Sequence, residues 1–554
     1  MMLLQRSRSC APAALAVTMA GAASVVFGAA PALAGVTLEE IGRYKTGIFG
    51  ASAAEISAYD AGSRRLFTID SGGDKLMVLD VSDPTNPAPV PFSPIDLSPY
   101  GASPNSVAAH GGLIAVAMDA DPSTDPGSVV FFDRDGKFLK QIEVGAGPDM
   151  LTFTPLGSRV LVANSGPPSD DYMVDPKGSV SIIDLTAGVR AATVATADFT
   201  AFNGQEEKLR ASGVRIFGPN ASVAEDLEPE YIDIAPLSPI AFVTMQENNA
   251  VARVNILTAK VEKIIGLGLK DHSAPGNGLD PSDRDGGINI NPWPVFGMYE
   301  PDGIAVYRTG WPLQTYFVTA NEGDARDFPP AFSEEIRVGD LAADQFDPKV
   351  FPDAARLRDP ANLGRLRISR VEGITETKDG RPIYGALHAY GARSFSIWTA
   401  DGTQVFDSGD QFEQITADLL GVEGFNSNHE EGPSFDNRSD DKGPEPSNVT
   451  IGHVGLEPFA FITLERVGGI IVYDISDPTS PAFCDYVNNR NFDVPYSLVR
   501  PPGEDPGDLG PEGVLFIPWW QSPTLKPLLV VSNEVSDTVT IYRVTHEPGP
   551  CRAS

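Results

Sequence analysis

Short apolar runs separated by turns recur along this chain from about residue 55 to its end. The segment RLFTIDSGGDKLMVLDVSDPTNP, which begins at Arg65, shows the pattern: two apolar runs flank the turn SGGD, and a Pro-containing turn follows. Runs of about four to eight residues rich in Val, Ile, Leu and Phe, bounded by Gly, Pro, Asp and Ser, are typical of β-strands. The pattern therefore predicts an all-β protein built from short antiparallel strands.

The same three-strand unit repeats along the chain. An acidic residue beside Pro opens a first strand, a second strand ends in acidic or amide residues, and a third strand ends in Asp and a turn. Such units cannot bury both faces alone, and their repetition predicts a single β-propeller. The units indicate about eight blades; the alternative is seven, with the irregular unit at Glu372 folded into its neighbour. They begin near Glu55, Asn105, Asp149, Glu230, Asp302, Glu372, Glu445 and Glu512.

The two ends of the repeat array are expected to meet. The last unit stops after the strand TVTIYRV, which begins at Thr538, and so lacks an outer strand. The N-terminal segment VTLEEIGRYKT, which begins at Val36, belongs to no unit. Pairing of these segments would close the last blade and remove exposed sheet edges. We therefore predict one propeller over residues 35–547, followed by a C-terminal tail at 548–554.

Four long insertions interrupt the regular spacing of the units. Insertions in repeat proteins map to loops, often on one face, and long loops frequently carry function. The alternative is that they only cover the rim of the propeller. They lie near residues 199–228, 268–299, 328–363 and 421–443.

Residues 1–34 have the features of a secretory signal. Two arginines precede an apolar run over residues 11–30, and the small-residue triplet Ala-Leu-Ala at 32–34 follows. This arrangement is typical of a Sec signal that is cleaved after Ala34, although an uncleaved anchor helix is the alternative. We predict a periplasmic or secreted protein.

Two cysteines remain in the predicted mature chain, Cys484 and Cys551. An even pair of cysteines in an exported protein predicts one disulfide, with two free thiols as the alternative. The disulfide would tie the C-terminal tail to the propeller.

The acidic composition excludes several classes of partner. The whole chain has 41 Lys+Arg and 74 Asp+Glu, a formal charge of −33. Removal of the predicted signal takes away two arginines and no acid, which leaves 39 basic and 74 acidic side chains and a charge of −35. Nucleic acids and anionic membranes bind basic surfaces. We therefore expect no nucleic-acid partner, no direct membrane insertion, a monomer, and a preference for cations.

Acidic residues recur at two positions in the units: the start of the first strand and the end of the second. Because antiparallel strands reverse direction, these two positions share one face of the propeller. Two rings of carboxylates at one channel end repel one another unless cations or hydrogen bonds compensate them. The first position carries Glu55, Asp149, Glu230, Asp302, Glu372, Glu445 and Glu512, and the second carries Asp70, Asp119, Glu247, Glu322, Glu465 and Glu534.

This acidic face is predicted to bind a divalent cation, with Ca²⁺ as the expected ion. Hard cations bind clustered carboxylate and carbonyl oxygens, and acids are densest over residues 321–327 and 426–445, although neither cluster has EF-hand spacing. The alternative is that each acid caps backbone amides in its own turn. The candidate ligands are Asp302, Glu322, Asp324, Asp327, Asp440, Asp441, Glu445 and Glu512.

Several segments resemble the choice-of-anchor I family. They include EPDGIAVY, TYFVTANEGDARDF, YGARSFSIW, VFDSGDQFEQIT and SFDNRSDDKGPEP, while VLDVSDPTNP and VYDISDPTSP are similar to LVIVD repeats. The resemblance covers essentially the whole mature chain. It implies a secreted or surface propeller akin to YVTN and LVIVD repeat proteins and to mesenchyme-specific cell surface glycoproteins. Family members carry differing C-terminal anchors, but this chain ends in HEPGPCRAS without a hydrophobic tail, so we expect a soluble form.

Catalytic signatures are scarce. The sequence has no G-x-S-x-G, P-loop or H-E-x-x-H motif, and its six histidines lack zinc-ligand spacing. We therefore predict a non-catalytic propeller whose acidic face binds divalent cations and an extracellular protein or carbohydrate. The alternative, which the resemblance implies through relatives with alkaline-phosphatase labels, is a calcium-dependent phosphoric ester hydrolase of alkaline phosphatase or phytase type. In that case metal-bound carboxylates activate water and Arg326 clamps the phosphate.

Overall fold

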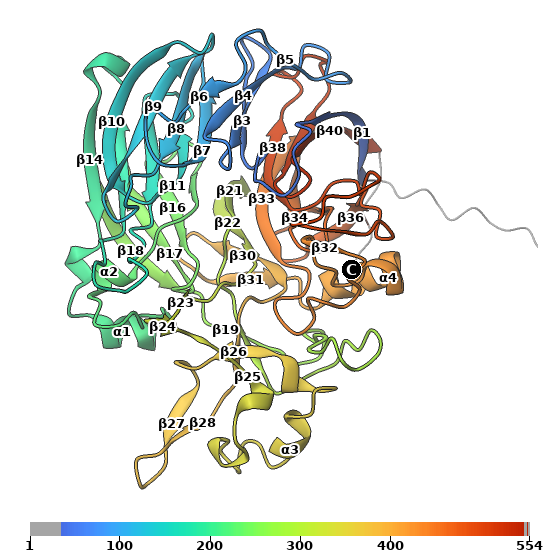
Figure 1. Cartoon of the computed structure of the whole chain (residues 1–554). Helices are drawn as coiled ribbons and strands as arrows, with labels where there is room; N and C mark the ends of the chain where they lie inside the picture. The colour runs from blue at the N-terminus through green and yellow to red at the C-terminus, as the bar shows by residue number, and fades with distance from the viewer. Residues whose placement is uncertain (1–34, 548–550, 552–554) are drawn as a thin grey trace, which may run out of the picture.

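The computed structural model describes residues 35–547 and Cys551, and the regular secondary structure of this part of the chain is mostly β-strand (Figure 1). The predicted signal at 1–34 and the tail at 548–554, apart from Cys551, lie outside the described residues. Apolar runs form strands as predicted: KLMVLD forms β4 (Lys75–Asp80), and its four central side chains are all buried. Consecutive buried positions show that both faces of the strand are covered.

Among the described residues, seven sheets of four or five antiparallel strands make up the body of the protein. The first four contain β2 (Ser57–Asp60), β3 (Arg65–Asp70), β4, β5 (Ala88–Pro89) and β6 (Ile95–Asp96); β7 (Pro104–His110), β8 (Leu113–Met118), β9 (Pro126–Asp133) and β10 (Phe138–Ala146); β11 (Pro148–Phe153), β12 (Arg159–Asn164), β13 (Ser179–Asp184) and β14 (Thr193–Asp198); and β15 (Ile232–Ile234), β16 (Ile240–Met245), β17 (Ala250–Asn255) and β18 (Lys260–Gly266). The other three contain β21 (Ile304–Thr309), β22 (Gln314–Asn321), β30 (Ser394–Thr399) and β31 (Gln404–Asp407); β33 (Pro446–Val454), β34 (Glu457–Leu464), β35 (Ile470–Asp474) and β36 (Ala482–Val487); and β38 (Pro511–Ile517), β39 (Leu528–Asn533), β40 (Thr538–Glu547) and β1 (Gly35–Lys45).

The first strands of these sheets form the inner wall of a ring. β2 contacts β7, and the contacts continue through β11, β15, β21, β33 and β38 back to β2. All seven strands line a central channel of about 700 Å³. Antiparallel sheets arranged around a channel define a β-propeller, the fold class that the repeat predicted.

β1 supplies the outer strand of the last sheet. It pairs antiparallel with β40, from Gly35 opposite Glu547 to Lys45 opposite Thr538. The N-terminal strand therefore completes the sheet that the C-terminal strands begin, as expected from the incomplete last unit. The pairing also satisfies backbone groups that would otherwise form an exposed edge.

The unit predicted to begin at Glu372 has no sheet of its own, which differs from the expected eight units. Its strand β30 pairs with β22, in the sheet that begins near Asp302. The segment LGRLRIS follows β22 in the sequence but does not join that sheet: it contains β26 (Arg367–Ser369), which pairs with β25 (Glu335–Arg337). The insertion after β22 carries LGRLRIS away from the ring, so the next apolar run takes the third position.

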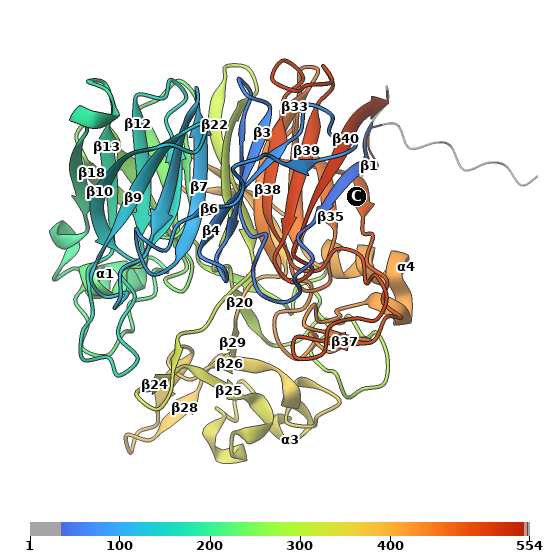
Figure 2. The ribbon, with the colours of Figure 1, turned by 45° about the horizontal axis from the view of Figure 1, so that its top comes forward.

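The insertions at 268–299 and 328–363, with residues up to about 391, form a lobe below the ring of sheets (Figures 1 and 2). The lobe has its own core, in which Val338, Phe346 and Leu366 are buried. It is therefore a packed unit. Its elements are β19 (Leu269–Asp271), β20 (Phe296–Met298), β23 (Asp327–Phe328), β24 (Phe332–Ser333), β25, η3 (Val338–Asp340), η4 (Ala343–Gln345), α3 (Ala354–Leu357), η5 (Leu363–Arg365), β26, β27 (Ile374–Glu376), β28 (Pro382–Tyr384) and β29 (His388–Ala389).

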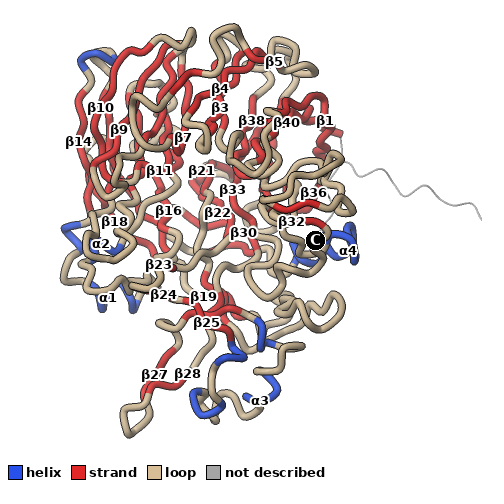
Figure 3. The backbone as a smooth tube through the Cα atoms, viewed as in Figure 1, coloured by secondary structure: helices blue, strands red, loops and turns tan. Residues whose placement is uncertain are grey.

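Helices outside the lobe are few and lie at the edge of the ring (Figure 3). The insertion at 199–228 forms short helices, and the stretch at 421–443 follows and overlaps the end of a longer one. These elements are η1 (Val189–Ala191), η2 (Thr200–Phe202), α1 (Glu206–Ala211), α2 (Val223–Asp226) and α4 (Gln411–Gly424), together with the strand pair β32 (Glu431–Gly432) and β37 (Tyr496–Ser497).

A disulfide joins Cys484 in β36 to Cys551, as predicted, across a sequence separation of 67 residues. Cys551 lies against Gly35, where a β carbon would stand 2.6 Å from the cysteine sulfur. The disulfide therefore holds Cys551 beside the first residue of the closing strand β1.

Replacing Cys551 by serine should lower the free energy of unfolding by about 4 kcal/mol, because the unfolded chain regains the entropy of a large open loop. Urea unfolding of the chain from Gly35 measures this change. Reduction of the wild-type protein should cause the same loss and should not destabilise the variant further. Equal unfolding midpoints for wild type and variant would contradict a stabilising crosslink.

Candidate cation-binding mouth of the channel

The strand register brings the recurring acids to one end of the channel. Pro148 at the start of β11 pairs with Asn164 at the end of β12, and Pro511 pairs with Asn533 in the same way. Residues beside these positions therefore gather on one face. A cavity of about 210 Å³ lies there, and we call its seven carboxylates the acidic mouth: Glu55, Asp149, Glu230, Glu247, Asp302, Asp324 and Glu512.

Six of the seven carboxylates form no ion pair with any described residue. The exception is Asp324, whose Oδ1 lies 3.8 Å from Lys442 Nζ. Hydrogen bonds do not fully compensate the others, because Glu55, Glu230 and Glu247 each have a buried carboxylate oxygen without a partner. Negative charge confined in this way requires bound protons or cations.

The crowding of the mouth raises the pKa of its carboxyl groups. Burial, assisted by neighbouring carboxylates, raises the pKa of Asp149 to about 7. Burial raises the pKa of Asp324 to about 6, against the opposing effect of Lys442. At neutral pH the mouth therefore holds protons that a cation can replace. The same causes raise the pKa well above its ordinary value for Glu230, Asp302 and Glu512.

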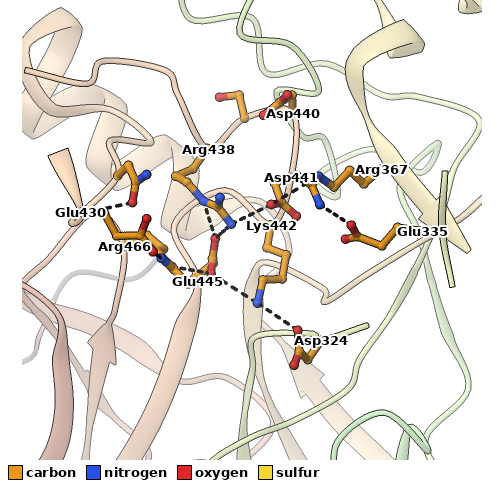
Figure 4. A network of polar contacts seen from close by, with 12 residues as sticks. Asp324, Glu335, Arg367, Glu430, Arg438, Asp440, Asp441, Lys442, Glu445 and Arg466 are labelled. Atoms are coloured by element: carbon orange, nitrogen blue, oxygen red, sulfur yellow. Dashed lines mark hydrogen bonds and ion pairs between the residues drawn. The ribbon is translucent and has the colours of Figure 1, made fainter. Parts of the chain in front are cut away.

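Lys442 supplies a positive charge at one edge of the mouth (Figure 4). Its Nζ lies 3.2 Å from Glu322 Oε1 and 3.4 Å from Glu445 Oε2. The ligand atoms of Glu322, Glu445 and Glu465 lie within 4.8 Å of one another, which is close enough to hold a metal ion. The Lys442 ammonium already compensates the negative charge of these three glutamates, so it takes the place that a bound metal ion would have.

Glu445 is the centre of an ion-pair network and is completely buried. One of its oxygens lies 2.5 Å from Arg438 Nη2, and the other lies 3.1 Å from Arg466 Nε (Figure 4). Although burial opposes ionisation, Arg438, Lys442 and Arg466 together hold the pKa of Glu445 well below its usual range. This predicted ligand therefore serves as a structural anion.

The predicted ligands Asp440 and Asp441 also bind arginines. Asp440 Oδ2 lies 2.6 Å from Arg337 Nη1 and 2.8 Å from Arg365 Nη2, and both arginines belong to the lobe. Asp441 Oδ2 lies 2.8 Å from Arg438 Nη2. Asp440 thus joins the loop at 421–443 to the lobe, Asp441 binds an arginine of its own loop, and neither lines the mouth.

The cluster over residues 321–327 divides between several environments. Asp324 belongs to the mouth, whereas Asp327 is exposed on β23 and does not line the cavity. Arg326 is buried, with Nη1 2.5 Å from Asp226 Oδ1 and Nη2 2.8 Å from Glu228 Oε1. Its guanidinium group is therefore bound inside the protein, an arrangement that does not favour a phosphate clamp.

Two arginines that the sequence analysis did not single out organise this end of the propeller. Arg466 links Glu445 to Glu465, with its Nε 3.2 Å from Glu465 Oε1. Arg215, from the insertion at 199–228, lies 2.6 Å from Glu300 Oε1 and also pairs with Glu334 of the lobe. Neither arginine stands in an acidic run, so only the folded chain reveals its partners.

The fold and its acidic mouth define a β-propeller with a carboxylate-lined channel end. The chain belongs to the choice-of-anchor I family, because the family model of the choice-of-anchor I domain matches residues 55–478. In the described part of the chain, no helix combines the length and apolar character that crossing a bilayer requires.

Two curated proteins are similar to this chain. Gigasin-3a of Magallana gigas is 29% identical over 194 residues, which cover 33% of this chain and 65% of Gigasin-3a. The mesenchyme-specific cell surface glycoprotein of Strongylocentrotus purpuratus is 24% identical over 392 residues, which cover 63% of this chain and 50% of that protein. The matches thus span about half to two thirds of these relatives. Among solved structures, Kuenenia stuttgartiensis hydrazine synthase matches with a TM-score of 0.45 and 11% identity over 91% of this chain and 100% of that chain.

Replacing Glu445 by glutamine should destabilise the protein by about 3–5 kcal/mol, because three surrounding cations lose a buried counter-charge. Urea unfolding without added metal measures this effect. Asp327→Asn is the matched control: it also removes one carboxylate charge, but from an exposed side chain, and should change stability by less than about 0.5 kcal/mol. Equal unfolding curves for the two variants would contradict the central role of Glu445.

Proposed function

We propose that this protein is an exported, seven-bladed, non-catalytic propeller whose acidic mouth binds divalent cations, with Ca²⁺ as the preferred ion. The observation that carries the proposal is the convergence of six carboxylates without ion-pair partners on one cavity of about 210 Å³. The seven sheets correspond to the blades, and the unit at Glu372 belongs to the blade of Asp302.

The donor set suits a hard cation. Calcium binds six to eight oxygen ligands and tolerates irregular geometry. The cavity is lined by the seven carboxylates together with Asn105, Ser106, Tyr231 and Gln246. The unpartnered oxygens of Glu55, Glu230 and Glu247 are available as acceptors. Glu230, Glu247 and Asp302 line the same cavity, but among the described residues they do not form a group with ligand atoms within 4.8 Å of one another. They would therefore bind the ion partly through water, with Asp149 and Glu512 as further acidic neighbours. Bound Ca²⁺ would compensate the repulsion that protons otherwise relieve.

The proposed role is extracellular binding of a protein or carbohydrate at the acidic face. Support comes from the family, from the relative named a cell surface glycoprotein, and from the predicted signal at 1–34. The lobe stands on the same side as the mouth, because it emerges between the end of β22 and the start of β30. Lobe and mouth together offer a structured surface for such a partner.

Hydrolysis of phosphoric esters is the less favoured function. An anionic substrate needs free cationic groups near the metal, and the basic residues of the acidic clusters are already paired. Arg326 binds Asp226 and Glu228, and Lys442 binds Glu322 and Glu445. The geometry therefore supports binding over catalysis.

Chelator-treated protein should lose stability as the pH rises from about 4 to 8. The folded-state pKa of Asp149 is about 7, and burial beside other carboxylates raises the pKa of Glu230, Asp302 and Glu512 well above its ordinary value, so the folded protein binds more protons than the unfolded chain across this range. Ca²⁺ competes with these protons. It should therefore raise Tm more at pH 8 than at pH 5. At 100 times its Kd, Ca²⁺ should add about 2.7 kcal/mol to the free energy of unfolding.

Asp302→Asn and Glu230→Gln should weaken this Ca²⁺ effect, measured by thermal unfolding and calorimetric titration, whereas Asp327→Asn should leave it unchanged. Absence of any Ca²⁺ effect at pH 8 would contradict cation binding.

A separate assay of a model phosphomonoester tests the second function. Calcium-dependent turnover that Glu322→Gln and Asp324→Asn abolish would show that the protein is a hydrolase.

A further inference from the structure

The face opposite the acidic mouth has an unusual composition at its centre. Each sheet has a turn between its first and second strands, and strand direction places all seven turns at the far end of the channel. These turns contain no aspartate or glutamate, although the chain has 74 acidic residues. We call them the turn face: residues 61–64, 111–112, 154–158, 235–239, 310–313, 455–456 and 518–527.

Large apolar side chains protrude from five of these seven turns. Leu156 is 89% exposed, Leu237 and Leu456 are 96% exposed, and Trp311 is 97% exposed. Trp519, Trp520 and Leu525 are also exposed on the last turn. Three of the five tryptophans of the chain thus lie on the turn face. Because each turn comes from a different sheet, the side chains form a ring of separate tips.

Leucine is unfavourable at two positions of the turn face, because the side chain is unpacked and the backbone is left-handed. Leu237 has φ 58° and Leu525 has φ 55°, a left-handed conformation that costs a bulky residue free energy. Neighbouring turns use glycine for the same conformation, as at Gly310 and Gly455. Burial does not offset this cost at either leucine, and a contact outside the folded chain would do so.

The turn face surrounds the far opening of the channel. Leu237, Leu313 and Gln521 line the 700 Å³ cavity together with the seven first strands. Arg64 and Lys526 are the charged residues of the turns, and both are exposed, while the exposed Glu457, which directly follows the turn at 455–456, lies 3.2 Å from His546 Nε2. The centre of this face is therefore apolar and weakly basic, whereas acids such as Asp83 and Asp477 lie on outer turns.

We propose that the turn face seats on the surface of a lipid bilayer. Isolated Leu and Trp side chains on separate tips suit a deformable interface, into which each inserts independently, and tryptophan favours the headgroup region. Arg64 and Lys526 complement lipid phosphates. The contact is peripheral and requires no membrane-crossing segment.

This orientation has a consequence for the other end of the molecule. A propeller seated on its turn face directs the acidic mouth and the lobe away from the bilayer. Carboxylates that an anionic headgroup would repel then face the aqueous phase. The seating does not depend on cation binding, because no mouth residue belongs to the turn face.

Binding to vesicles tests the proposal. The chain from Gly35 is mixed with phosphatidylcholine vesicles, and bound protein is measured by flotation. This lipid has no net charge and therefore does not repel the negatively charged protein. The variant Leu156→Asn/Leu237→Asn/Leu456→Asn should bind at least tenfold more weakly than wild type with an unchanged Tm, since all three side chains are exposed. The matched control Met173→Asn/Val499→Asn removes exposed apolar side chains from mouth-side loops and should bind as wild type does.

Tryptophan fluorescence gives a second readout. Trp293 and Trp398 are buried, so a blue shift on addition of vesicles reports on Trp311, Trp519 and Trp520. Absence of vesicle binding by wild type, or equal binding by the triple variant, would overturn the proposal. So would light scattering that shows a dimer which the triple variant dissociates, because the face would then bind a second copy. Asp302→Asn should retain vesicle binding, which separates this test from that of the mouth.

Discussion

Ring closure by the pairing of β1 with β40 is the interaction on which the rest of the structure depends. Each sheet covers its faces against two neighbours, so an open ring would leave apolar faces and strand edges exposed. The hydrogen bonds between the first and last strands remove this exposure. The disulfide between Cys484 and Cys551 holds Cys551 against Gly35 of the same strand. The repeated strand order makes all first strands point the same way and so brings the acids to one channel end, and closure holds these strands around a single channel.

Charge at that end is arranged in two parts. At one edge the protein supplies its own cations, and Lys442, Arg438 and Arg466 surround the buried Glu445. Across the cavity, carboxylates such as Glu230 and Asp302 have no such partner among the described residues. Both parts contain several carboxylates, so the difference lies in where basic side chains reach. The paired edge stabilises the loops, and the unpaired part retains the capacity for an external cation.

The two ends of the channel differ because the turns at each end come from different parts of the repeat. Turns between first and second strands are short, and they carry leucine, tryptophan, proline and glycine without acids. Starts of first strands carry the acids, and the insertion after β22 adds the lobe on their side. The two ends of the channel therefore have different surfaces, although both are built from the same repeating unit.

Periodicity explains how much the sequence could predict. The acids Glu55, Asp149 and Glu512 stand at equivalent positions of successive units, and the register of antiparallel strands converts equal positions into one face. The same argument predicts the closing strand, because the last unit lacks one. It fails for the irregular unit at Glu372, where the apolar run of β30 replaced a strand that the insertion had displaced.

The folded positions of the insertions determine which acidic residues line the mouth, and the repeat does not predict these positions. Asp324 and Asp327 belong to one acidic run, yet only Asp324 lines the mouth. Asp440 meets Arg337 and Arg365, which lie far away in sequence on the lobe. The sequence by itself therefore determined the propeller, its closure and the acidic face, because these follow from local periodicity. Only the tertiary structure decided which acids are neutralised, because ion pairs depend on non-periodic loops that meet after folding.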